Sequence, residues 1–129
     1  MVNRRLFAIV MILGLGTVAV RHLAAQEAQT TPQIMDKKTE LAQQLVKAVV
    51  LEDFEEIEDA ATELDYLAEF QSWFVLPTPE YAQHSKDFRA AAKRVASAGE
   101  NEDSDAALTS YTAMMDKCLK CHQYMKSVQ

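Results

Sequence analysis

The chain has 129 residues, with 13 lysines and arginines against 19 acidic residues and a formal net charge of −6. Its apolar fraction of 49% is ordinary for a folded protein and excludes a disordered chain. The 3 glycines and 3 prolines are too few for the many turns of an all-β protein. The acidic balance argues against a nucleic-acid-binding protein, which needs a basic face.

The first 25 residues have the pattern of a secretory signal peptide. Arg4 and Arg5 are followed by 15 mostly apolar residues, and the segment ends in two alanines. This apolar stretch is shorter than the roughly 20 residues of a membrane span. We therefore expect residues 1–25 to be a signal peptide, with an uncleaved anchor as the alternative. Residues 26–129 are then an exported, periplasmic domain, which keeps 10 basic and 19 acidic residues.

Apolar residues at three- and four-residue spacing predict two helices in the first half of that domain. The first, over 33–51, follows Thr31 and Pro32, which suit a helix start. The second, over 54–74, follows Asp53, a capping residue with Glu56 three positions on. A single long helix is the alternative, because no glycine or proline separates the two segments.

The second half of the domain predicts two more helices. Thr78 and Pro79 begin a helix over 79–98, and Gly99 is expected to end it. A polar loop leads into the last helix, over 103–127. Four amphipathic helices with short connections favour an all-α fold, an antiparallel up-down four-helix bundle.

Both cysteines of the chain lie in one run, Cys118-Leu119-Lys120-Cys121-His122. On a helix these two thiols and the imidazole project from one face, because they are three and four residues apart. Two thiols can then bond to the two vinyl groups of one porphyrin while the imidazole binds its iron. The Cys-x-x-Cys-His pattern is typical of covalent c-type haem attachment.

Three other uses of the cysteines are weaker. A thioredoxin-like redox pair needs a βαβ context, which the chain lacks. A zinc site needs four ligands, and the domain could supply them only by adding His84 to Cys118, Cys121 and His122. A disulfide within the motif would close too short a loop to stabilise the fold much.

An export signal, four predicted helices and Cys118-Leu119-Lys120-Cys121-His122 on the last helix resemble the class II c-type cytochromes, the cytochrome c prime family. The resemblance implies one haem c per chain, with thioether bonds to Cys118 and Cys121 and with His122 as the proximal iron ligand. It implies electron transfer, or else binding of NO or CO at a five-coordinate iron, and a homodimer through the first two helices. No base–nucleophile pair is present, so we expect no enzymatic activity.

The sixth iron ligand separates the two implied functions. Met114, Met115 and Met125 share a helix with His122 and cannot easily reach the opposite side of the haem, which leaves Met35 and His84. In the resembling family the distal residue comes from the N-terminal part of the first helix, where Met35 lies. Met35 is therefore the candidate sixth ligand, with His84, water or a vacant position as alternatives.

Two further groups of side chains surround the predicted haem. Aromatic residues near the ends of the second and third helices either line the haem or form ordinary core. Three lysines around the motif form a basic rim on which an acidic redox partner protein could dock. The aromatic residues are Phe70, Trp73, Phe74, Tyr81 and Phe88, and the lysines are Lys117, Lys120 and Lys126.

Overall fold

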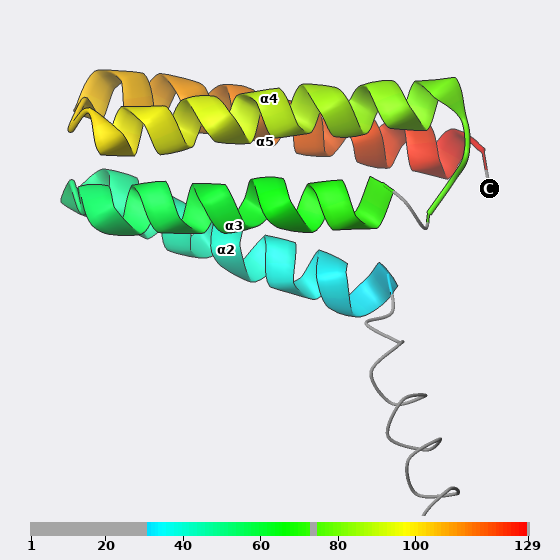
Figure 1. The fold of residues 1–129 in the computed structure, drawn as a ribbon, viewed down its shortest axis with the longest axis horizontal. Helices are drawn as coiled ribbons and strands as arrows, with labels where there is room; N and C mark the ends of the chain where they lie inside the picture. Colours follow the sequence, from blue (N-terminus) through cyan, green and yellow to red (C-terminus); the bar gives the residue numbers. More distant parts are fainter. Residues whose placement is uncertain (1–30, 73–74, 129) are drawn as a thin grey trace, which may run out of the picture. The chain divides into compact units, whose positions relative to one another are not determined.

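The computed structural model describes residues 31–72 and 75–128, and the regular secondary structure of this part of the chain is all α-helix (Figure 1). The prediction of four helices and no strand is confirmed for these residues. None of the described helices is both long enough and apolar enough to span a membrane. The predicted signal over 1–25 lies outside the described residues. The helices are α2 (Thr31–Leu51), α3 (Phe54–Ser72), α4 (Pro79–Glu100) and α5 (Ser104–Ser127).

A two-residue break separates α2 from α3, so the alternative of one long helix is wrong. Glu52 turns the chain in the left-handed region, with φ of 54°. Asp53 then starts α3, because its carboxylate accepts a hydrogen bond from the backbone N–H of Glu56 at 3.3 Å. Ser104, at the start of α5, donates to the carboxylate of Glu52 at 2.7 Å and connects the two turns.

Helix α4 begins as predicted but ends later than predicted. Thr78 caps its start by accepting from the backbone N–H of Tyr81 at 3.2 Å. Gly99 does not end the helix, which continues to Glu100 and is followed by Asn101. The chain turns at Glu102, with φ of 53°, and the glycine has no positive φ. The local rule that placed the stop at Gly99 was therefore wrong.

Gly99 is instead a point of close approach between α4 and α3. A Cβ at this position would lie 2.8 Å from the backbone nitrogen of Glu58 and 2.9 Å from the carbonyl oxygen of Phe54. Both neighbours are backbone atoms, so they cannot rotate away. Only glycine allows the two helices to pack at this distance.

Helices α3 and α4 run side by side, and the contacts between them occur in opposite order along the two helices. Ser85 of α4 donates to the carbonyl of Ala68 at 3.3 Å, and Arg89 one turn on pairs with Asp65 at 2.7 Å. In Figure 1 the N-terminal half of α2 diverges from α3. The fully buried side chains of the core include Leu41, Leu45, Ile57, Leu64, Val95 and Met114.

Candidate functional site

A cavity between the four helices brings the cysteine motif together with both predicted distal residues. Its volume is about 140 Å³. This is roughly ten times the space that one buried water needs. We call it the motif cavity. Each helix contributes to its wall, which includes Met35, Leu64, His84, Cys118, Cys121 and His122.

The motif on α5 presents three reactive side chains to this cavity. Cys118 and Cys121 are half-buried and form no disulfide. Burial raises the pKa of both thiols, and the nearby Lys38 ammonium opposes the shift. His122 is more exposed but also lines the cavity. The structure thus places the three motif side chains at one wall, as the helical spacing predicted.

Both candidates for the sixth ligand lie at the motif cavity. Met35 reaches it from α2 and is half-buried. His84 reaches it from α4, and its ring lies 5.1 Å from the ring of Tyr124, centroid to centroid. The Tyr124 hydroxyl shares a 2.9 Å hydrogen bond with Thr78, which fixes the end of α5 beside the start of α4. The positions of Met35 and His84 at the cavity are therefore compatible with either residue as the sixth ligand.

The aromatic residues singled out from the sequence divide into two groups. Tyr81 and Phe88 are buried and line the motif cavity. Burial, together with the charge of Cys121, raises the pKa of the Tyr81 phenol to about 12. Phe70 lies on the outside of α3 and is 40% exposed. The other two aromatic residues, Trp73 and Phe74, lie outside the described residues.

Two polar residues of the cavity wall were missed at the sequence level. Lys38 donates to the side-chain oxygen of Gln71 at 3.3 Å, and its ammonium lies 4.4 Å from the ring centroid of Phe88. Burial lowers the pKa of Lys38, while the charges of the two cysteines raise it. The register could have revealed both residues: Lys38 follows Ile34 by four positions, and Gln71 follows Leu64 by seven, each on a buried stripe.

The zinc site, an alternative use of the motif, can be compared with these contacts. Among residues 31–72 and 75–128, no group of three or more histidine, cysteine or acidic side chains could hold a metal ion. The four-ligand zinc site that His84 would complete is therefore not assembled in the described residues.

Helix α5 also contains the basic rim. In this rim, Lys120 pairs with Asp116 at 2.8 Å, and Lys117 pairs with the same carboxylate at 3.4 Å.

The comparisons with known proteins add no assignment. No protein-family model, no curated protein and no solved structure matches this chain. The motif cavity and its side chains are therefore the features that indicate a function.

Proposed function

We propose that the protein is an exported monohaem c-type cytochrome that transfers electrons, an antiparallel up-down bundle with its haem attached to α5. The observation that carries this proposal is that Cys118, Cys121 and His122 line one cavity whose wall is mainly apolar. Met35 lies on the same cavity from a different helix. Two thiols, one imidazole and apolar surroundings are what covalent haem attachment requires.

Each side chain of the motif has a separate task in this proposal. The thiols of Cys118 and Cys121 would each add across one vinyl group, with the sulfur bonding to one carbon and the thiol hydrogen going to the other, so that no oxidant is consumed. His122 would supply a nitrogen ligand to the iron. When bound, the haem supplies a reversible one-electron couple. The apolar wall that includes Leu64 and Phe88 would limit the access of water to the haem, which influences its reduction potential.

A gas-binding function is the second candidate, and one feature of the cavity wall favours it. Thr39 and Ala42, two small side chains, line the cavity from the same helix as Met35. If Met35 does not bind the iron, these small residues leave room for NO or CO on the distal side. The two functions therefore differ in whether Met35 acts as the sixth ligand.

Visible absorption spectra test both candidates in one series. We expect the protein, expressed with a haem-attachment system, to carry one haem that survives denaturation, and the Cys118→Ser/Cys121→Ser variant to carry none. We expect a low-spin reduced spectrum that carbon monoxide leaves unchanged. Met35→Ala should become high-spin and bind the gas, whereas the control Met125→Ala should not, because Met125 is not in the cavity wall.

Two results would contradict these expectations. A wild-type protein without covalent haem would remove the proposed function altogether. A wild-type spectrum that is high-spin and shifts with carbon monoxide would replace electron transfer by the gas-binding candidate.

We also propose that an acidic redox partner docks at the basic rim of Lys117, Lys120 and Lys126. Asp116 pairs with the first two of these, which lowers the pKa of its carboxyl group and weakens their outward charge. We therefore expect reduction by an acidic partner to slow with added salt, modestly, and Lys126→Gln to slow it as well. A rate independent of salt would contradict this docking surface.

A further inference from the structure

The motif cavity contains a cation that has no acidic partner. Lys38 extends into it from α2, yet no carboxylate of residues 31–72 and 75–128 lies within ion-pair distance of its ammonium. The adjacent Lys37 differs, because it pairs with Glu40 at 3.6 Å and Glu63 at 3.9 Å on the outer surface. Placing an unpaired charge away from water costs free energy, and an anion bound beside Lys38 would offset that cost.

The side chain of Gln71 is a second, independent indication that the cavity binds a hydrogen-bond acceptor. It is 2% exposed and lines the same cavity, and its side-chain nitrogen is buried without a hydrogen-bond partner. Its side-chain oxygen faces Lys38, because a lysine ammonium can only donate. The amide N–H groups therefore remain available for another acceptor, and an unmade bond of this kind is costly when buried.

The other cavity residues around Lys38 do not supply that acceptor. Helix α5 presents Cys118, Cys121 and His122, and α4 presents Tyr81 and His84. The wall of the cavity contains no aspartate or glutamate, although the whole chain has 19 acidic residues. The wall near Lys38 and Gln71 thus offers thiols, imidazoles and hydroxyl groups but no carboxylate.

We propose that Lys38 and Gln71 form a carboxylate-binding site that holds an acidic side group of the haem inside the motif cavity. This inference rests on the proposed function, because the haem brings the carboxylate with it. Lys38 supplies the charge and one donor, and Gln71 supplies the amide donor that is now unpaired. A charge-assisted bond of this kind would hold that carboxylate in one position inside the cavity.

The test uses the haem-loaded protein and follows its reduction potential between pH 5 and 9, together with the resonance Raman bands of the haem carboxyl groups. In Lys38→Met we expect the pKa of the held carboxyl group to rise by about 1–3 units, since an opposite charge has been removed. The potential then increases toward low pH more steeply than in wild type, and the carboxyl bands shift.

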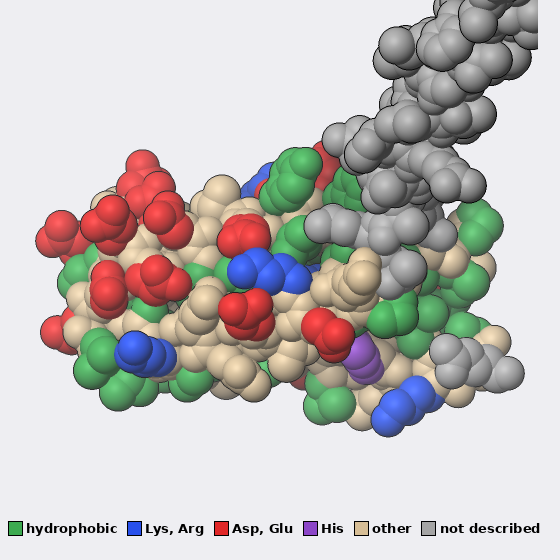
Figure 2. All heavy atoms as spheres, turned by 90° about the horizontal axis from the view of Figure 1, so that it is seen from below, with side chains coloured by type: hydrophobic (Ala, Val, Ile, Leu, Met, Phe, Trp, Pro, Cys, Tyr) green, Lys and Arg blue, Asp and Glu red, His purple; other side chains and the backbone are tan. Residues whose placement is uncertain are grey.

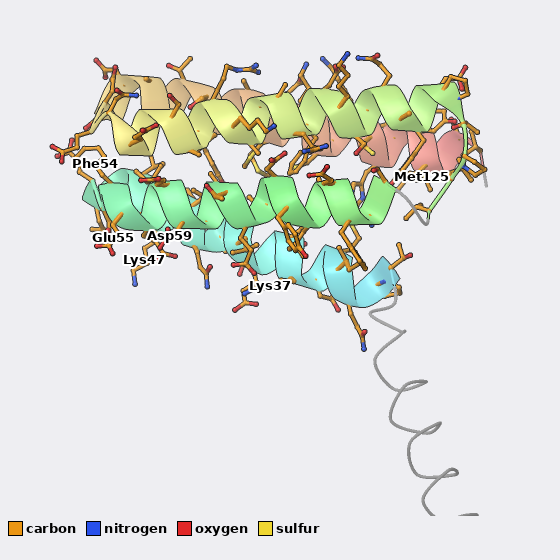
Figure 3. All side chains as sticks on the ribbon, in the orientation of Figure 1. Lys37, Lys47, Phe54, Glu55, Asp59 and Met125 are labelled. Atoms are coloured by element: carbon orange, nitrogen blue, oxygen red, sulfur yellow. The ribbon has the colours of Figure 1, made fainter. Side chains whose placement is uncertain are left out.

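Three further variants isolate the cause. Lys38→Arg keeps the cation and should keep the wild-type profile. Gln71→Leu should change the pH dependence of the reduction potential in the same direction as Lys38→Met. This variant replaces Lys38→Met in the test if Lys38→Met does not fold. Lys37→Met is the matched control, because Lys37 points away from the bundle in Figure 3 and should leave the profile unchanged.

The outcomes separate this inference from the proposed function. Covalent haem in every variant, with profiles and bands identical to those of Lys37→Met, would overturn the carboxylate site and leave the cytochrome proposal intact. Loss of a low-spin spectrum in Lys38→Met alone would also overturn it, since Lys38 would then bind the iron. A potential that depends on added acetate in the wild type would show that the site takes a free carboxylate and not that of the haem.

Discussion

Tyr81 shows how strongly the cavity wall acts on a single side chain. The phenol is buried beside the cysteine motif, and its pKa rises to about 12 from its ordinary value near 10. An unfolded chain therefore loses this proton at a lower pH than the folded chain does. The stability that follows from this difference is complete below pH 10 and is lost as the pH rises toward 12.

Replacing Tyr81 by phenylalanine should remove this pH dependence and keep the packing of the ring. In the Cys118→Ser/Cys121→Ser background, where no thiol titrates, we expect the free energy of unfolding to fall less between pH 9 and 11 in Tyr81→Phe than in its parent. Denaturant titrations at several pH values measure it. Tyr66→Phe is the control, because Tyr66 is 66% exposed; equal slopes in all three proteins would contradict the prediction.

The motif and its polar neighbours were not equally predictable. The positions of Cys118, Cys121 and His122 on one wall follow from helical spacing alone, which is a local property. Lys38 and Gln71 stand on buried stripes as well, but lysine and glutamine usually lie on the surface. The register shows that they stand on those stripes, but whether such a residue faces a cavity depends on how α2 and α3 pack on the other helices.

Helix ends show the same division at the level of elements. The starts of α3 and α4 were predicted because Asp53 and Thr78 act on backbone groups within three residues. The end of α4 was not, because Gly99 serves the contact with α3 and not the turn. A glycine near a helix end has two physical uses, and the sequence alone did not distinguish them.

Gly99→Ala should therefore destabilise the bundle without changing its helix content. The added methyl group would meet backbone atoms of Phe54 and Glu58, so α4 and α3 must separate. We expect a loss of about 1–3 kcal/mol in the free energy of unfolding, the usual cost of overpacking. Thermal or urea unfolding measures it, with Glu100→Ala, an exposed neighbour, as the control. A stabilised Gly99→Ala protein would show that the glycine only weakens the helix.

Across the four helices as a whole, the cluster of acidic side chains and the motif cavity lie toward opposite ends. Acidic side chains gather at the end where α2 meets α3 and α4 meets α5 (Figure 2). Part of this charge stabilises the α3 N-terminus, where Glu55 and Glu56 occupy the first turn. The motif cavity instead lies toward the N-terminal ends of α2 and α4 and the C-terminal ends of α3 and α5. The acidic end would therefore repel an acidic partner and leave the basic rim as its approach.

The cavity also makes the bundle uneven in stability. The N-terminal half of α2 forms one wall of the motif cavity, through Met35 and Lys38, while its C-terminal half packs in the core through Leu41 and Leu45. Side chains that border an unfilled space lose the contacts that would hold them. Without haem, the first turns of α2 should thus be the part of the described chain that opens most easily.

Amide hydrogen exchange can measure this unevenness directly. In the haem-free Cys118→Ser/Cys121→Ser protein, we expect residues 31–40 to exchange at least about tenfold faster than residues 41–51, since a difference of 1.4 kcal/mol in opening free energy has that effect. Haem attachment in the wild type should slow exchange in the first segment far more than in the second, because a filled cavity restores contacts on one side of α2 only. Exchange that slows equally along α2 would mean that the haem stabilises the bundle as a whole, and that the N-terminal half does not depend on it for its packing.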